Sequence, residues 1–319
     1  MILNFLYCFD ANYNLQARNS IISLLDKSLK EVSIFIVHQN PTSFEEIKKE
    51  IAEHRNLHKI EVYEFQSELI ESFPRVLNTH ISEATYYRLF MERYIPSDVD
   101  YITYLDADII CSKAPQELIY AEIEKLKLSD FIISVKTEGI IEDELADINI
   151  RLESKTGKYF NAGVQIIDYG RWKSQDISRR LLDELYRIKE KIYFWDQDVL
   201  NSFFDGEYVE LSKFLNYNLH LTGEDYKDNT PKEDIDKMVF IHYAGSHKPW
   251  SVRGIFNPKS KYYQNQHMKL NNNNYHIVNT WRLAALYRFI TGILTLRIIF
   301  IKRPFRFIYN VIKSFINND

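Results

Sequence analysis

Short apolar runs alternate with amphipathic segments in the first third of the chain, and this alternation limits the possible folds more than any other feature. The apolar runs cover residues 2–9, 32–38 and 101–105, and residues 59–66 have the pattern of a further strand. The segments between them, residues 15–29, 43–56 and 82–95, have the spacing of helices, and Ser43 is the expected N-cap of the second. Strands alternating with helices predict an α/β protein with an open sheet and parallel pairing.

Composition excludes several classes of protein. The chain has 319 residues with 45% hydrophobic content, enough for one large domain, alone or with a small appendage. Its net charge of −4 lacks the basic field of nucleic-acid binders, so we expect no nucleic-acid partner. Cys8 and Cys111 lack metal-type spacing, which favours a reducing compartment. The first run resembles a strand rather than a signal peptide, so we expect a cytoplasmic protein.

The run at residues 101–105 ends in two aspartates. Asp106 and Asp108 are two apart on an extended segment, so both side chains can reach one point while the small Ala107 turns away. Ligands of open α/β sheets gather at the carboxyl ends of strands. Two like charges so close favour a hard divalent ion, Mg²⁺ or Mn²⁺. Alternatively, one aspartate caps the next segment, or the first is the phosphorylated nucleophile of a haloacid-dehalogenase-type phosphatase.

Polar residues also flank two later elements. In residues 159–172, Asn161 precedes Ala162 and Gly163 and then an apolar strand, so a ligand could approach the backbone closely. In residues 194–204, three polar residues stand at a helix start, where carboxylates could equally serve as caps: Asp196, Gln197 and Asp198.

Two basic groups complete the candidate set. His242 ends a strand, and Gly245 and Lys248 follow it before a proline, an arrangement suited to holding a diphosphate. A histidine at the end of a strand is more often structural. Arg88 lies inside an expected helix, where its ordinary partner would be Glu92, four residues on.

Six segments in order resemble glycosyltransferase family 8 over roughly residues 1–255: CFDANY, HISEATYYRL, YLDADII, YFNAGVQIID, WDQDVLN and HYAGSHKPW. The resemblance implies a GT-A fold, a Rossmann-like open mixed sheet flanked by helices. It also implies a UDP-sugar donor bound with Mn²⁺, for which Mg²⁺ could substitute. The phosphatase alternative is weaker, because IICSKAP after Asp108 lacks the continuation which that class expects.

The resemblance also implies roles for individual residues. Asp106, Asp108 and His242 would bind the metal. Asp10 would recognise the uracil base, and Lys248 would bind the diphosphate. The sugar pocket and its catalytic groups would be Arg88, Asn161, Asp196 and Gln197. The full donor-binding set would comprise Cys8, Asp10, Asn12, Tyr13, Arg88, Asp106, Ala107, Asp108, Asn161, Ala162, Asp196, Gln197, Gly245 and Lys248.

The implied reaction is retaining transfer of a hexose, from UDP-galactose or UDP-glucose, to a surface glycan, glycolipid or glycoprotein. The metal and Lys248 would stabilise the leaving diphosphate. Gln197 or Asp196 would stabilise the cationic sugar. Front-face attack is favoured, and a covalent intermediate stays open. The alternatives are a glycogenin-like self-glycosylating protein and a non-catalytic scaffold. Ala11 replaces a frequent second aspartate, which is compatible with nucleotide binding. Trp195 replaces a common polar residue, which leaves the choice of sugar or acceptor open.

The end of the chain differs in charge from the rest. Residues 275–319 contain seven Lys and Arg residues and one Asp, so this part carries a net charge of +6 and the remainder carries −10. We expect a catalytic domain at 1–263, a linker at 264–274 and a C-terminal helical basic and apolar extension. Its longest uncharged run, residues 289–296, is far shorter than the roughly 20 residues of a membrane span.

This composition predicts peripheral binding to an anionic membrane surface, on the inner face of the cell membrane. Trp281, Tyr287 and Phe300 are the expected anchors. Membrane binding would bring the enzyme to a lipid-linked or membrane-proximal acceptor. The alternative is a helical subdomain that packs on the catalytic domain.

Overall fold

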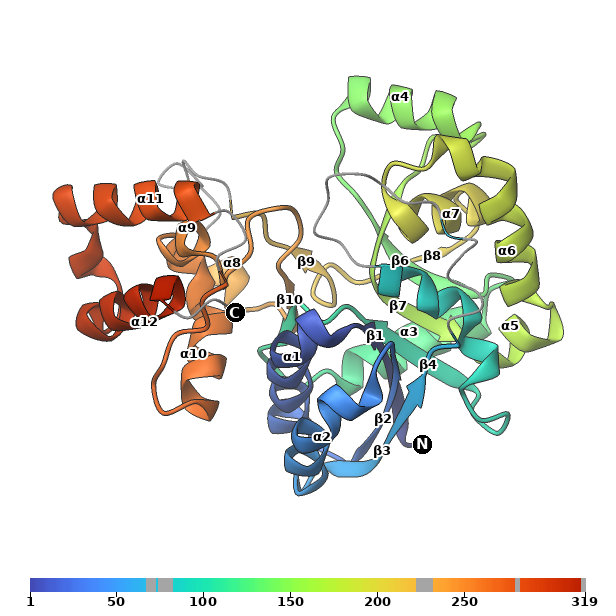
Figure 1. Cartoon of the computed structure of the whole chain (residues 1–319). Helices are drawn as coiled ribbons and strands as arrows, with labels where there is room; N and C mark the ends of the chain where they lie inside the picture. Colours follow the sequence, from blue (N-terminus) through green and yellow to red (C-terminus); the bar gives the residue numbers. More distant parts are fainter. Residues whose placement is uncertain (67–72, 74–82, 222–231, 279–281, 317–319) are drawn as a thin grey trace.

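The computed structural model describes all residues except 67–72, 74–82, 222–231, 279–281 and 317–319. Figure 1 shows its α/β unit with the last helices, drawn in orange and red, gathered on one side. The main sheet has the order β3-β2-β1-β4-β7-β6-β8, and a smaller sheet has the order β5-β10-β9. The strands are β1 (Leu3–Phe9), β2 (Val32–His38), β3 (Leu57–Glu64), β4 (Tyr101–Leu105), β5 (Ile109–Cys111), β6 (Ile133–Thr137), β7 (Phe160–Asp168), β8 (Val209–Glu210), β9 (Tyr217–Asn218) and β10 (Phe240–His242).

Helices cover both faces of the main sheet. The α-helices are α1 (Asn14–Lys27), α2 (Glu45–Ala52), α3 (Gln116–Lys127), α4 (Glu142–Leu152), α5 (Tyr169–Ser174), α6 (Ile177–Ile188), α7 (Trp195–Phe204), α8 (Lys232–Ile235), α9 (Val252–Ile255), α10 (Lys261–Leu270), α11 (Arg282–Leu294) and α12 (Pro304–Ile316). The 3-10 helices are η1 (Ala11–Tyr13), η2 (Pro41–Phe44), η4 (Glu83–Arg93), η5 (Lys189–Lys191), η7 (Pro258–Ser260) and η8 (Arg297–Phe300).

Alternating residues of β1 enter two separate cores. Phe5 and Tyr7 pack with residues of α1 and α3 on one face of the sheet. Leu6 and Cys8 pack with residues of η4, α6 and α7 on the other. Because successive side chains of a strand point to opposite faces, a strand covered on both sides is largely apolar, and β1 is apolar except for the half-buried Asn4.

Strand direction follows the sequence prediction. β1 runs parallel to β2 and β4, and β2 runs parallel to β3. β7 runs antiparallel to both β4 and β6, so the sheet is mixed, as the family resemblance implies. The parallel pairing expected for the first third of the chain is confirmed, and the antiparallel strand β7 lies beyond it, because residues 138–159 leave and re-enter the sheet at the same end, where Thr137 pairs with Phe160.

Two expected helix starts differ from the structure. Ser43 is not the N-cap of α2, because Pro41 begins the 3-10 turn η2 and the hydroxyl of Ser43 donates to the carbonyl of Asn40 at 2.7 Å. The helix expected over residues 82–95 is the 3-10 helix η4, and residue 82 lies outside the described part.

The expected linker at 264–274 is wrong for its first part, because residues up to Leu270 belong to α10. Helix α10 buries Tyr263, Gln264, His267 and Met268, a spacing that places them on one helical face. The helix and the residue after it are tied to α1, since the Arg18 guanidinium donates to Asn271 Oδ1 at 3.0 Å.

Helices α11 and α12 pack on α9 and α10. One apolar cluster contains Phe256 after α9, Met268 of α10, Phe289 of α11 and Phe307 of α12. Gly292 allows the close approach of α11, because a Cβ there would lie 2.2 Å from the ring of Phe256. Among the helices that the structure describes, none combines the length and the apolar character needed to cross a membrane.

Candidate active site

A pocket of about 490 Å³ opens where the chain leaves the carboxyl ends of β1 and β4. It is lined by thirteen of the residues singled out in the sequence: Cys8, Asp10, Tyr13, Arg88, Asp106, Ala107, Asp108, Asn161, Asp196, Gln197, His242, Gly245 and Lys248. Asn12 and Ala162 support its wall instead. The backbone N–H of Asn12 donates to Asp10 Oδ1 at 2.9 Å, and the carbonyl of Ala162 accepts from Arg88 at 2.6 Å.

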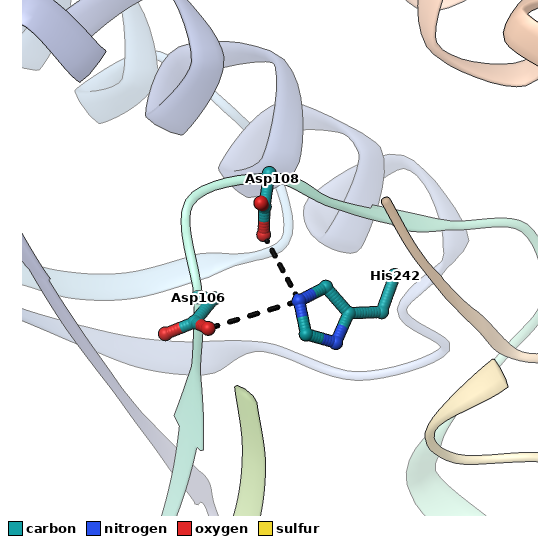
Figure 2. A group of neighbouring side chains, drawn as sticks. All are labelled: Asp106, Asp108 and His242. Carbon is teal, nitrogen blue, oxygen red and sulfur yellow. Dashed lines mark ion pairs between the residues drawn. The ribbon is translucent and has the colours of Figure 1, made fainter. Parts of the chain in front are cut away.

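Asp106 and Asp108, just beyond β4, meet His242 at the end of β10 (Figure 2). One ligand atom from each residue lies within 4.8 Å of the others. His242 Nε2 is 3.7 Å from Asp106 Oδ2 and 3.3 Å from Asp108 Oδ1. The absence of a side chain at Gly163 makes this approach possible, because a Cβ there would lie 2.3 Å from His242 Cε1.

The chemistry of this cluster fits a divalent ion. Two carboxylates and one imidazole are ligands that Mn²⁺ accepts. Asp108 Oδ1 is buried and, among the described residues, lacks a hydrogen bond of good geometry, with His242 Nε2 3.3 Å away; a bound cation would stabilise this anionic oxygen. Asn216 Oδ1 lies 3.3 Å from His242 Nδ1, and a hydrogen bond from that nitrogen would leave Nε2 free to bind a metal.

Lys248 adds a fixed positive charge on the other side of Asp108. Its ammonium donates to Asp108 Oδ2 at 2.7 Å and to the carbonyl of Tyr243 at 2.8 Å. Burial raises the pKa of Asp108, but Lys248 and His242 outweigh it and hold that pKa below its ordinary value. Burial lowers the pKa of Lys248, and Asp108 raises it to a net value above the ordinary one. Both groups are therefore charged at neutral pH.

Arg88 links the two acidic parts of the pocket rather than pairing with Glu92. Its guanidinium donates to Asp106 Oδ1 at 3.0 Å and pairs with Asp196 Oδ2 at 2.8 Å. It also lies over the ring of Tyr104, 3.8 Å from the centroid. Burial raises the pKa of Asp196 to about 7, with Arg88 opposing the rise and Asp106 adding to it.

Asp198, near the start of α7, stabilises the local backbone and does not line the pocket. This fully buried carboxylate pairs with Arg151 at 2.6 Å and accepts the backbone N–H groups of Tyr193 and Phe194 at 2.7 and 2.8 Å. It thereby fastens the turn before Trp195, whose φ of 47° is unusual for a bulky residue. Of the acidic residues at this helix start, Asp198 caps the turn, and Asp196 faces the pocket with Gln197.

The other end of the pocket is formed by η1 and the chain after β10. Asp10 caps η1, and Tyr13 packs edge-on against Trp250 with 6.0 Å between ring centroids. Burial raises the pKa of the Cys8 thiol, so the thiol is neutral there.

Several pocket residues have no sequence signal that singles them out. Glu138 lines the pocket and accepts from Asn161 Nδ2 at 2.7 Å. His220 also lines it, opposite Gly245, where a Cβ would lie 2.9 Å from the His220 ring. Asn216, Glu138 and His220 lie in short or irregular segments, and only the fold brings them to the site.

Comparisons with known proteins agree with this geometry. The model of the family described as Glycosyl transferase family 8 matches residues 4–254. A lipopolysaccharide 1,3-galactosyltransferase of Salmonella typhimurium is 30% identical over 272 residues, which are 82% of this chain and 76% of that protein. A lipopolysaccharide 1,2-glucosyltransferase of Escherichia coli K12 is 29% identical over 271 residues, 82% of this chain and 76% of that protein.

A solved structure supports the assignment of the fold. The galactosyltransferase LgtC, in complex with donor and acceptor sugar analogs, superposes with a TM-score of 0.67 at 21% identity, covering 88% of this chain and 99% of that chain. The family match extends over most of the sequence and includes both aspartates and the histidine of the cluster. The chain therefore belongs to glycosyltransferase family 8 and is a hexosyltransferase with the GT-A fold.

Proposed function

We propose that this enzyme transfers a hexose from UDP-galactose or UDP-glucose to a surface glycan or glycolipid, with retention of configuration and dependence on a divalent ion. Mn²⁺ is the favoured ion, and Asp106, Asp108 and His242 would hold it. The observation that carries the proposal is the meeting of this cluster with Lys248 in one pocket. The names of the lipopolysaccharide transferases above support the choice of sugars and acceptor.

The residues of the pocket divide between leaving group and sugar. When bound, the ion would supply positive charge to the departing diphosphate. Lys248 would stabilise the same charge from a position fixed by Asp108 and Tyr243. Asp10 and Tyr13, at the far end of the pocket, would contact the nucleoside.

The sugar would lie near Arg88, Asn161, Asp196 and Gln197. Gln197 Oε1 accepts the N–H of Ala162 at 3.0 Å, so its amide is held in place to stabilise a cationic sugar. Asp196 is paired with Arg88 and Gln197 is a neutral amide, so neither is a strong nucleophile. We therefore favour front-face attack, in which an oxygen of the departing phosphate takes the proton of the acceptor hydroxyl.

UDP release tests the metal and donor assignments. Rates would be measured with UDP-galactose, UDP-glucose and UDP-N-acetylglucosamine, each with Mn²⁺ and with a chelator. Asp108→Asn and His242→Ala should remain folded and lose metal-dependent release, while Asp26→Asn on α1, whose carboxylate pairs with Lys269 outside the pocket, should retain it. Wild-type rates in both pocket variants would refute the metal site. An increase in the intact mass of the enzyme after incubation with a UDP-sugar and no acceptor would instead indicate self-glycosylation.

We further propose that the C-terminal helices bind an anionic membrane surface. Their inner faces pack on the body through Ala285, Phe289 and Phe307, as the subdomain alternative expected. Their outer faces expose large apolar side chains, and Tyr287 and Phe300 are 72% and 85% exposed. The predicted anchor Trp281 lies outside the described residues.

The charge of this surface fits the same partner. Lys302, Arg303 and Arg306 are exposed beside the apolar side chains. Basic residues near an anionic membrane contribute about 1 kcal/mol each to binding. We propose a place on the inner face of the cell membrane, where a lipid-linked acceptor would be within reach.

A further inference from the structure

Three consecutive backbone carbonyls hold the loop that carries Lys248. The carbonyl of Lys248 accepts from the N–H and the hydroxyl of Ser251, at 3.0 and 2.8 Å. The carbonyl of Pro249 accepts from Gln264 Nε2 at 2.8 Å. The carbonyl of Trp250 accepts from the N–H of Val278 at 2.8 Å. Ser251 ends the loop itself, whereas Gln264 and Val278 lie in segments that follow later in the chain.

Gln264 joins this loop to the base of the C-terminal segment. Its amide nitrogen also donates to the carbonyl of His276 at 2.9 Å, and its amide oxygen accepts the N–H of His276 at 3.1 Å. The side chain of Gln264 is almost fully buried, so each of these bonds lacks competition from water. His276 in turn stacks on Trp250, with 6.0 Å between centroids and 25° between planes.

Helix α9 presses on the loop from the opposite side. A Cβ on Gly254 would lie 2.1 Å from the Lys248 carbonyl oxygen, so the absence of a side chain lets the helix approach this closely. The loop is therefore confined between α9, Gln264 and residues 276–278. The Lys248 ammonium, which projects from this loop, is held at Asp108 as a result.

We propose that Gln264, together with residues 276–278, positions Lys248 for the diphosphate, so that the donor site depends on the chain well beyond residue 263. This inference rests on the proposed role of Lys248. Gln264 is a positioning residue, because it acts through the backbone of the loop and does not line the pocket.

A double-mutant cycle on the full chain tests the inference. The affinity for UDP in MnCl₂ would be measured by calorimetry for Lys248→Ala, for Gln264→Met and for the double variant. Methionine conserves volume while removing the three hydrogen bonds of the amide. The matched control is Gln266→Ala, on the same helix, whose amide contacts Asp26 instead.

We expect Lys248→Ala to weaken UDP binding by about 10- to 100-fold, the usual effect of losing a charged hydrogen-bonding partner. Gln264→Met should weaken it by roughly 3- to 10-fold in the wild-type background and by less than about 2-fold beside Lys248→Ala, because residues that act through one contact are not additive. Gln266→Ala should leave the affinity unchanged.

The outcomes separate the two proposals. An unchanged affinity in Lys248→Ala would refute the diphosphate role and, with it, the positioning role. A weakened Lys248→Ala together with an equal effect of Gln264→Met in both backgrounds, or none in either, would overturn the positioning role alone. Circular dichroism would check folding. If Gln264→Met does not fold, Val278→Pro takes its place in the same cycle, because it removes the N–H that donates to the Trp250 carbonyl.

Discussion

Asn216 lies against the nitrogen of His242 that faces away from the two aspartates. It is fully buried, lies 3.3 Å from His242 Nδ1 through its oxygen, and donates from its nitrogen to Asn161 Oδ1 at 3.0 Å. An asparagine in this place can therefore orient the imidazole and Asn161 together. A partner that orients a metal-binding histidine usually matters nearly as much as the ligand itself.

Asn216→Ala should lower the affinity for Mn²⁺ by about 10- to 100-fold, because the imidazole loses the partner that orients it. Calorimetric titration with MnCl₂ would measure the change. Asn56→Ala, which removes a structural amide that bonds Leu25 and Ser28 far from the pocket, should leave the affinity unchanged. Equal affinities of the wild type and Asn216→Ala would show that His242 is oriented by other contacts.

At the scale of elements, the turn before α7 depends on one buried ion pair. Asp198 is 0% exposed and Arg151 is 12% exposed, and the guanidinium ties α4 to the start of α7. Removing one partner of such a pair leaves a buried charge uncompensated, which costs more than the pair itself contributes.

Arg151→Met should lower the free energy of unfolding by about 3–5 kcal/mol. It should also slow UDP release, because Asp198 holds the turn that leads into Asp196 and Gln197. Urea denaturation and the release assay would measure the two effects. Arg187→Met removes an arginine that is 46% exposed and pairs at the surface, so its cost should stay within about 1 kcal/mol. Similar costs for the two variants would contradict the argument.

Two histidines stack between α10 and the base of the C-terminal segment. The ring centroids of His267 and His276 are 4.9 Å apart. Tyr263 is hydrogen-bonded to His276, and Asn19 is hydrogen-bonded to His267. Arg18 is the charged group near His267. Burial lowers the pKa of His267 to about 4 and that of His276 to about 3. Both rings are therefore neutral in the folded protein at moderately acidic pH.

Acid should therefore destabilise this junction. Below the ordinary histidine pKa of about 6.5 the unfolded chain binds protons that the folded protein does not, so each ring costs about 1.4 kcal/mol of stability per pH unit down to its folded pKa. Urea unfolding at pH 7, 6 and 5 would measure the slope. His276→Phe keeps a ring for the stack and should show a shallower slope than the wild type. Identical slopes would mean that His276 does not contribute.

At the scale of the whole molecule, two surfaces differ in what they expose. The C-terminal helices present Phe300 and Phe305, 85% and 86% exposed, among basic residues. The catalytic unit presents Leu128, 89% exposed, at the end of α3. Single apolar residues are normal on a surface, but a cluster combined with positive charge fits an anionic membrane.

Phe300→Glu with Phe305→Glu should lower binding to anionic phosphatidylglycerol vesicles by at least about tenfold, because burial of one such ring contributes roughly 1.5–3 kcal/mol. Co-sedimentation would measure binding, and phosphatidylcholine vesicles would show the contribution of charge. UDP release without acceptor should be unchanged, as should vesicle binding of Leu128→Glu. Absence of binding of the wild-type protein to anionic vesicles would refute the membrane proposal.

The sequence by itself determined the parts that depend on local order. The continuous apolar runs identify strands buried on two faces, because both sides of each strand must be apolar. The six family segments identified the pocket residues Asp106, Asp108 and His242, since each short motif keeps its local form. The basic excess of the last 45 residues is likewise visible without coordinates.

Only the tertiary structure decided which distant groups meet. Lys248 and Asp108 are 140 residues apart, and Gln264 reaches Pro249 and His276 from a segment that the sequence suggested was a linker. Arg88 likewise pairs with both Asp106 and Asp196, across the fold, rather than with Glu92 on the same helix. A local pattern reports which face of an element is buried, but a hydrogen bond between elements depends on how the whole chain is brought together.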